Sequence, residues 1–141
     1  MVFSKKCLVL GMHIEQLREY CLSKKGVTEH FPFDNDTLVF KVLDKMFLMV
    51  PLDRWEHGNY VSVVKTDVEW AEELRDIYEG FMGGFQMSRK PNAKYVFAKH
   101  WNSINHNLDI KDEFAFELID HSYEMVIKGM AKKQRATLDK L

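Results

Sequence analysis

Apolar side chains recur at intervals of three and four residues in three segments of the chain. This spacing predicts amphipathic helices at about 12–25, 67–79 and 110–129. The side chains expected to face inward are Ile14, Leu17, Tyr20 and Cys21 in the first helix, Val68, Ala71, Leu74 and Tyr78 in the second, and Phe114, Ala115, Leu118, Ile119, Ser122, Met125, Val126 and Gly129 in the third. Each helix therefore has one face to bury against another element.

Residues at the ends of these segments support the helix boundaries. Thr66 and Glu69 have the spacing of a capping box, in which the two side chains satisfy free backbone N–H groups at the start of the second helix. Asp109 is expected to cap the third helix. Gly26 and Gly80 predict the ends of the first and second helices, because glycine readily adopts the backbone conformation that terminates a helix.

Short segments rich in β-branched and aromatic residues lie between the helices. They predict strands at about 37–42, 46–50, 60–65, 81–87 and 95–104. The resulting element order is α-β-β-β-α-β-β-α. One-sided helices and partly alternating strands indicate an α+β fold, a two-layer sandwich in which helices cover one face of an antiparallel sheet.

The composition is that of one ordinary domain. The chain has 141 residues, of which 46% are hydrophobic and 29% charged, so it can bury a core of its own. No repeat or low-complexity linker divides it, and we expect one domain at 12–141 after an N-terminal extension at 1–11. Cys7 and Cys21 form no metal motif or disulfide framework, which favours reduced thiols in the cytoplasm. No apolar run approaches the roughly 18 residues that span a bilayer, so no membrane association is expected.

Recognisable motifs are spread over nearly the whole chain. They are His13–Leu22, Gly26–Phe33, Leu38–Val42, the run Lys99, His100, Trp101 and Asn102, the run Asp120, His121, Ser122 and Tyr123, and the basic segment Ala131–Arg135. Together they resemble the MmcQ/YjbR family of small bacterial proteins. The resemblance implies a secretion-chaperone-like or frataxin-like α+β fold, which agrees with the order predicted from periodicity. It also implies DNA binding through a surface with paired wings.

The chain departs from the family pattern before His100. In the family, a methionine of the fourth strand lies a few residues before the Lys-His-Trp-Asn run, whereas here residues 88–98 separate Met87 from Lys99. The hairpin between the fourth and fifth strands is therefore longer. It carries a concentrated group of cations, which makes it the best candidate for a basic wing.

The residues that could contact DNA are Arg89, Lys90, Lys94, Lys99, Trp101, Asn102, Lys132, Lys133 and Arg135. Trp101 could stack on a base, or it could be an aromatic residue at the rim of the core. Asn102 could instead end a strand through a turn bond. The last three cations could contact phosphates, or they could form a solvated end that complements the dipole of the third helix. The formal net charge of -1 argues against strong non-specific binding.

Histidines in the second half of the chain suggest acid–base or metal chemistry. On a helical wheel, His121 lies at the border of the apolar stripe and Asp120 points to solvent, so the two do not form a dyad. A zinc site needs three or four ligands at fixed geometry, and the spacing of His100, His106 and His121 does not supply them. We therefore interpret His121 as a boundary histidine and expect no metal.

Other reactive residues lack the context of a catalytic site. Ser122 lies on the apolar face, where its hydroxyl is expected to bond back to the Leu118 carbonyl, and no nucleophile elbow surrounds it. Cys21 is expected to be an inert core thiol. Gly83 and Gly84 lack the lysine of a phosphate-binding loop. Because no nucleophile, base and orienting group occur together, we expect no enzyme and no cofactor.

Two hypotheses for function remain. The first is a non-enzymatic protein that binds DNA through the basic hairpin wing. The alternative is a protein- or ligand-interaction module that uses the open face of the sheet and binds no nucleic acid. The eight methionines fit an adaptable binding surface as well as a core. In either case we expect a monomer or a weak homodimer.

Overall fold

The computed structural model describes residues 12–86, 95–96 and 100–141. Its helices are α2 (Ile14–Leu22), α3 (Leu52–Glu56), α4 (Val68–Ile77), α5 (Asp112–Lys128) and α6 (Lys132–Asp139). Its strands are β1 (Val27–His30), β2 (Thr37–Val42), β3 (Lys45–Pro51), β4 (Val61–Lys65), β5 (Phe81–Gly83), β6 (Phe85–Gln86), β7 (Tyr95–Val96) and β8 (Trp101–Asn105). The expected N-terminal extension at 1–11 lies outside the described residues.

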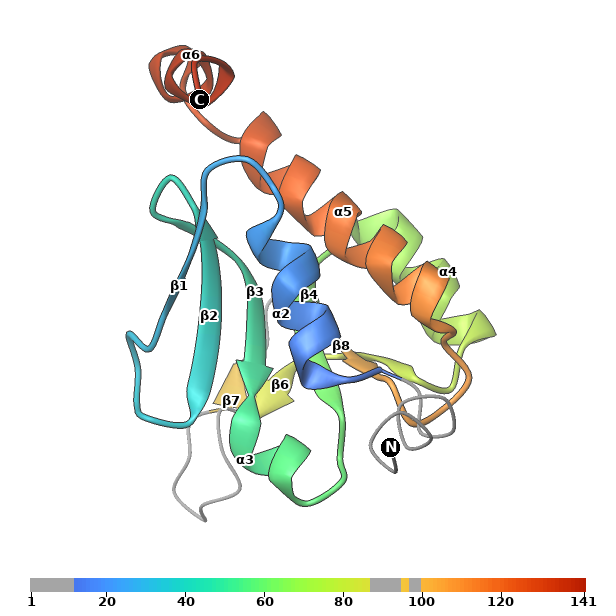
Figure 1. Ribbon diagram of the computed structural model, residues 1–141. Helices are drawn as coiled ribbons and strands as arrows, with labels where there is room; N and C mark the ends of the chain where they lie inside the picture. Colours follow the sequence, from blue (N-terminus) through green and yellow to red (C-terminus); the bar gives the residue numbers. More distant parts are fainter. Residues whose placement is uncertain (1–11, 87–94, 97–99) are drawn as a thin grey trace.

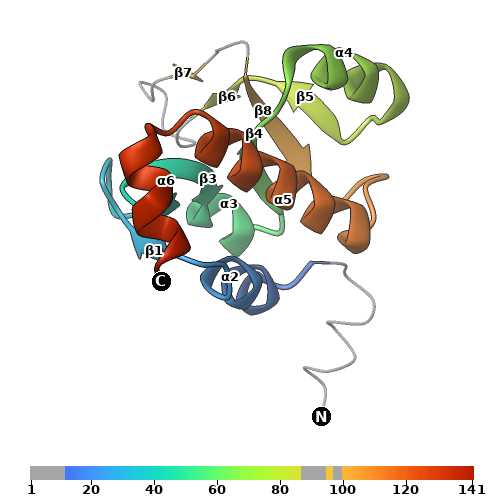
Figure 2. The ribbon, with the colours of Figure 1, turned by 90° about the horizontal axis from the view of Figure 1, so that it is seen from above.

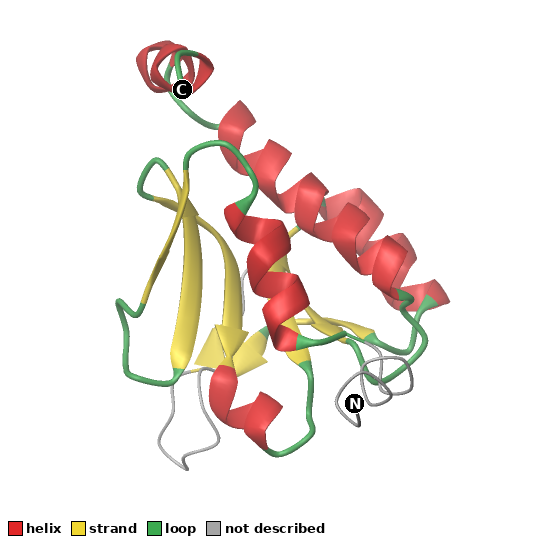
Figure 3. Ribbon diagram, in the orientation of Figure 1, coloured by secondary structure: helices red, strands yellow, loops and turns green. Residues whose placement is uncertain are grey.

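Six strands form one antiparallel sheet in the order β1-β2-β3-β4-β8-β5. Helices α2 and α5 pack across one face of this sheet (Figure 1). The view from above places the short β6–β7 pair on the opposite side of the sheet from α2 and α5 (Figure 2). Figure 3 shows the resulting layers of helix and sheet. The predicted α+β fold with an antiparallel sheet is confirmed.

The main core lies between the sheet and the helices. On β2, the alternating residues Leu38, Phe40 and Val42 are buried against this layer, as their spacing predicts. Helix α5 contributes Leu118 and Ile119, both fully buried. The period of two in the strand and the period of 3.6 in the helix thus bring two apolar faces together, and burying these faces provides the main stabilisation.

A second apolar cluster occupies the face of the sheet that α2 and α5 leave uncovered. Val39, Met49 and Val63 are buried there, and Met46 and Trp101 pack against them. The interaction-module alternative relied on an open sheet face. That part of the prediction is wrong at the centre of the sheet, because these side chains are already removed from solvent.

The described residues contain elements that sequence patterns missed. Strand β1 lacks clear alternation and is held by antiparallel pairing with β2. The segment between the predicted strands at 46–50 and 60–65 contains the one-turn helix α3, in which Trp55 is buried and its indole N–H donates to the Val61 carbonyl at 2.7 Å. The basic segment beyond Gly129 forms the further helix α6. These elements are too short for periodicity to reveal, so tertiary contacts decide them.

Two predicted helix caps are wrong. Asp67, not Thr66, caps α4, because its carboxylate accepts a hydrogen bond from the Trp70 N–H at 3.1 Å. The Thr66 hydroxyl is buried and has no hydrogen-bond partner among the described residues. Asp109 does not cap α5; it accepts bonds from the N–H groups of Glu79 and Gly80 at 2.9 and 2.7 Å. It thereby ties the turn after α4 to the start of α5.

Candidate functional site

The four-residue motif Asp120, His121, Ser122 and Tyr123 lies in the middle of α5. Successive residues of a helix point about 100° apart, so the four side chains do not share one direction. Asp120 and Tyr123 both reach the end of α2, whereas His121 and Ser122 reach other parts of the fold. The contacts of the four side chains give the motif a structural role at the centre of the molecule.

Ser122 joins α5 to two strands. Its hydroxyl donates to the Phe47 carbonyl at 2.5 Å and accepts from the Lys65 N–H at 2.8 Å. Phe47 is the additional residue of a bulge between β2 and β3, and Lys65 lies where the pairing of β3 with β4 has ended. The predicted bond to the Leu118 carbonyl is wrong, because the hydroxyl replaces hydrogen bonds that the sheet cannot make at this point.

Asp120 joins α5 to α2. Its carboxylate accepts a hydrogen bond from the Tyr20 hydroxyl at 2.6 Å and pairs with the Lys24 ammonium. The same ammonium lies 5.0 Å from the ring centroids of Tyr20 and Tyr123. Burial, followed by the bond to Asp120, raises the pKa of Tyr20 to about 12. The Asp120 side chain remains 45% exposed, so it lies on the solvent side as predicted, and its carboxylate also joins the two helices.

The two outer contacts of the motif are made by His121 and Tyr123. The His121 Nε2 accepts from the Asp67 N–H at 3.0 Å, and its ring lies edge-on to Trp70. Burial lowers the pKa of His121, which favours the neutral ring required to accept this bond. The Tyr123 hydroxyl donates to the Lys25 carbonyl at 2.5 Å. His121 is thus a boundary histidine with a structural partner.

The second motif, His100 to Asn102, is divided between the two faces of the sheet. Trp101 packs against the second apolar cluster, on the face opposite α2 and α5. Asn102 is fully buried on the other face, where its Oδ1 accepts from Arg75 at 2.6 Å. The proposed contact between Asn102 and DNA is therefore wrong. Because Trp101 is only half-buried, it retains some exposed surface.

A buried pair that sequence reasoning did not anticipate lies between β4 and the end of β8. The Ser62 hydroxyl is 2.6 Å from His106 Nε2, and both residues are buried beside Trp55. Burial lowers the pKa of His106 to about 4, so the ring is neutral at pH 7. Its Nδ1 has no hydrogen-bond partner among the described residues. With no third group to orient the ring, the pair lacks the arrangement of a catalytic triad.

Cys21 is buried in the core, where burial raises its pKa to about 12. The thiolate that reacts or binds metal is therefore strongly disfavoured. Within residues 12–86, 95–96 and 100–141, no group of three or more His, Cys, Asp or Glu side chains could hold a metal ion. The same residues contain no helix with the length and apolarity needed to cross a bilayer.

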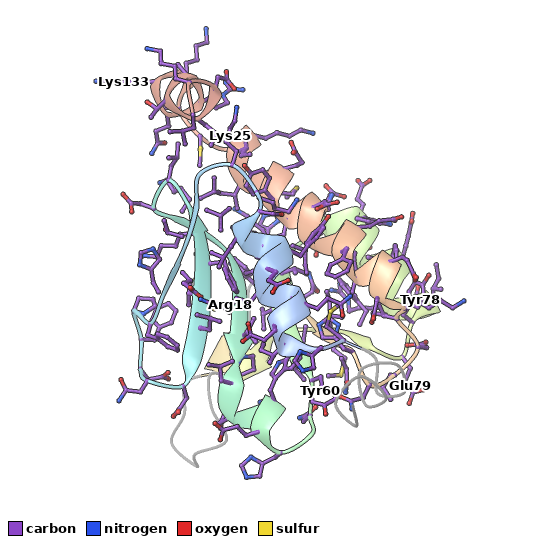
Figure 4. The ribbon with its side chains drawn as sticks, viewed as in Figure 1. Arg18, Lys25, Tyr60, Tyr78, Glu79 and Lys133 are labelled. Atoms are coloured by element: carbon purple, nitrogen blue, oxygen red, sulfur yellow. The ribbon has the colours of Figure 1, made fainter. Side chains whose placement is uncertain are left out.

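The basic residues proposed to contact DNA do not form one surface among the described residues. Lys132, Lys133 and Arg135 are exposed on α6, and the labels of Lys25 and Lys133 lie at the same end of the molecule (Figure 4). The β6–β7 pair lies far from α6, towards the other end of the sheet (Figure 1). The predicted hairpin cations, Arg89, Lys90, Lys94 and Lys99, lie outside the described residues.

Comparison with known proteins gives consistent matches. The YjbR family model matches residues 22–125. The Escherichia coli K12 protein named "Uncharacterized protein YjbR" is 28% identical over 130 residues, which are 92% of this chain and 100% of the relative. The crystal structure of Deinococcus radiodurans protein DR2400, with the DUF419 domain, is 30% identical with a TM-score of 0.74 and covers 89% of this chain and 87% of its own. A Pseudomonas syringae protein shares the fold at 18% identity and a TM-score of 0.62, over 82% of this chain and 99% of its own.

Proposed function

The chain belongs to the YjbR family, and we propose that it is a non-enzymatic protein that binds DNA through the basic end of the molecule. The basic end comprises the exposed cations Lys25, Lys128, Lys132, Lys133, Arg135 and Lys140. The proposal moves the contact surface from the hairpin wing to helix α6 and the end of α5. The E. coli relative is itself named an uncharacterised protein, and the support for DNA binding comes from the residues of this chain.

The main support for the proposal is that the cations of α6 are exposed to solvent. Among the residues of this helix only Leu138 is buried, and it packs beside Gly26. Lys132 and Lys133 lie roughly 120–140° around the helix axis from Leu138, and so they face away from the fold. Among the described residues, no salt bridge involves the six cations of the basic end.

The position of the two lysines does not help the helix itself. They occupy the first turn of α6, where the helix dipole is positive and the preceding residue, Ala131, provides no side-chain cap. Cations at this position are unfavourable by a few tenths of a kcal/mol, roughly 0.3–1 each. Lys128, in the last turn of α5, has the favourable position. A bound phosphate group would turn the unfavourable placement of Lys132 and Lys133 into an attraction.

The near-neutral total charge does not argue against this surface, because the charges are segregated. Helix α4 carries the exposed acids Glu69, Glu72, Glu73 and Asp76. In Figure 1, α4 and α6 lie on different sides of the molecule. On α6 itself the one acidic residue is Asp139. A phosphate backbone that approaches α6 therefore meets an excess of positive charge.

Reversing the charge at Lys133 should weaken DNA binding. We expect Lys133→Glu to reduce affinity for a labelled duplex about tenfold at low salt, and to reduce the slope of log K against log salt by roughly 0.9, the value for one lost phosphate contact. Fluorescence anisotropy at two or more salt concentrations measures both quantities, with duplex and single-stranded probes. Lys111→Glu is the matched control, because Lys111 is exposed at the opposite end of α5 and the substitution changes the net charge equally.

Two results would contradict the proposal. If neither probe shows salt-dependent binding at low salt, the protein does not bind DNA. If Lys90→Glu with Lys94→Glu abolishes binding while Lys133→Glu leaves it unchanged, DNA binds through the hairpin and not through the basic end.

The docking of α6 should depend on Gly26. This residue has φ +76°, and a Cβ added to it would lie 2.7 Å from Leu138 Cδ1. We expect Gly26→Ala to cost about 1–2 kcal/mol of stability through backbone strain. The displaced Leu138 should also loosen α6, so that DNA affinity falls although every cation is retained. Thermal unfolding, amide hydrogen exchange in α6 and anisotropy measure the three effects.

Gly58→Ala separates the effect of backbone strain from the effect of displacing Leu138. Gly58 also has a positive φ, +79°, but a Cβ added there would meet nothing within 4 Å. This variant should share the strain while leaving α6 and DNA binding unchanged. Equal hydrogen exchange in α6 of the two variants would show that Leu138 does not depend on the space beside Gly26.

A further inference from the structure

Two aromatic side chains are exposed at the end of the edge strand β1. Phe31 and Phe33 have 50% and 53% of their surface exposed and flank Pro32. Phenylalanine side chains in a small domain are usually buried in the core. Two exposed rings within three residues therefore form a concentrated apolar feature, which we call the Phe31/Phe33 pair.

The segment that follows the Phe31/Phe33 pair is held in a defined turn. Asp34 Oδ1 accepts hydrogen bonds from the N–H groups of Asp36 and Thr37 at 2.8 and 2.7 Å. The Asp36 carbonyl in turn accepts from the Leu52 N–H at 2.8 Å, which joins the loop to the start of α3. The loop is therefore anchored at its C-terminal end by this turn and at its N-terminal end by β1. Such anchoring lowers the entropy lost when the rings bind a partner.

Strand β1 has an open side. It pairs with β2 and has no second strand neighbour within the described part of the chain. In Figure 1, β1 forms the outer margin of the sheet. The other edge strand, β5, has only three residues and ends in Gly83. Unpaired backbone groups on β1 can therefore accept an additional strand.

The residues of β1 do little to prevent such pairing. Proteins commonly protect an edge strand by making it very short or with lysine, proline or a bulge. β1 is short and Pro32 follows two residues after it, but its four residues, Val-Thr-Glu-His, include no lysine or proline and its pairing with β2 has no bulge. Its one acid, Glu29, is paired with Arg18 through two hydrogen bonds of 2.6 and 2.8 Å, which hold the pKa of this carboxyl below its usual range. Figure 4 shows Arg18 beside the β1 side of the sheet.

We propose that β1 and the Phe31/Phe33 pair bind a short, extended, apolar segment of another protein, which adds to the sheet as a strand and packs one of its side chains on the exposed rings. This inference is independent of DNA binding, because the Phe31/Phe33 pair follows the last residue of β1, whereas α6 packs beside Gly26, immediately before the first residue of β1. The partner segment needs no basic residue opposite Glu29, because Arg18 already pairs with this carboxylate.

The length of β1 favours a peptide segment over a second copy of this chain. Four residues span about 13 Å of strand, at roughly 3.3 Å per residue. A stable dimer buries about 800 Å² on each partner, far more than the pairing of two four-residue strands would bury. A linear segment needs no larger surface, because the edge supplies the hydrogen bonds and the rings supply an apolar anchor.

A library of random seven-residue peptides displayed on phage provides the test. Selection uses the wild-type protein, with counter-selection on Phe31→Ser with Phe33→Ser. The control variant is Ile77→Ser with Met82→Ser, which removes two other exposed apolar side chains. We expect enriched peptides with apolar residues at alternate positions, whose binding weakens at least about tenfold in the phenylalanine variant and not in the control.

Backbone pairing is tested with the same peptides. Synthetic versions should shift the amide NMR signals of residues 27–31 and 33, and methylation of alternate peptide N–H groups should abolish the shifts because it removes donors to β1. The proposal fails if no enriched peptide distinguishes wild type from the phenylalanine variant, if the shifts lie elsewhere, or if the methylated peptide binds equally well. A concentration-dependent dimer that the phenylalanine variant abolishes would identify the occupant as a second copy and overturn the proposal.

Discussion

Replacing Ser122 with alanine is expected to lower the free energy of unfolding by about 3 kcal/mol, because a buried donor or acceptor left without a partner costs roughly 1–3 kcal/mol. The substitution removes one hydroxyl but leaves two backbone groups unpaired, the Phe47 carbonyl and the Lys65 N–H. Both groups lie where the regular pairing of β3 is interrupted. No neighbouring strand group can take over these bonds without moving the bulge.

Chemical denaturation followed by circular dichroism measures this effect, and the melting temperature should fall by roughly 10 °C. Ser23→Ala is a matched control, since the Ser23 hydroxyl also donates to a backbone carbonyl, that of Tyr20, but at an exposed position. It should cost no more than about 0.5 kcal/mol. A loss for Ser122→Ala as small as that of the control would show that water or a backbone shift satisfies the two groups.

Acidification from pH 6.5 to about 4 is expected to remove about 3 kcal/mol of stability through His106 alone. Burial lowers the pKa of this ring to about 4 in the folded protein, against 6.5 as its ordinary value. Between these two pH values the unfolded chain binds a proton that the folded protein excludes, so protonation favours unfolding. The contribution of His106 is therefore complete above pH 6.5 and is lost as the pH falls towards 4.

Denaturant titrations at several pH values between 7 and 4 check this expectation. His106→Gln keeps a side chain that can bond to Ser62 but cannot titrate, and it should remove most of the pH dependence in this window. His121, whose pKa burial also lowers, accounts for a smaller part in the same direction. A profile that His106→Gln does not alter would place the pH dependence on other groups.

The chemistry of a side chain does not by itself predict whether the residue contacts a ligand or bonds within the fold. Asn102 was a candidate for contact with DNA and Ser122 was expected to bond within its own helix, yet both are buried and bonded to other parts of the fold. The sequence shows which residues carry polar groups. It does not show that a strand bulge at Phe47 creates an unpaired carbonyl for Ser122 to bond. The exposed cations of α6 were recognisable in the sequence, whereas their presentation on a separate helix was not.

Local pattern by itself determined the larger elements of this protein. Helices α2, α4 and α5 and strands β2, β3 and β4 follow from apolar spacing, because their faces must be buried whatever their neighbours are. The α+β class follows from the order of these elements. The motifs that identify the family are also visible in the sequence without any structure.

Tertiary structure alone decided the short elements and the partners of polar groups. Strand β1 exists because β2 lies beside it, and α6 docks because Leu138 finds the space next to Gly26. The Ser62–His106 pair joins residues 44 positions apart, a distance along the chain over which local sequence carries no information about contact. The physical reason is that burial of an apolar face depends on composition within one segment, whereas a hydrogen bond depends on where a second segment lies.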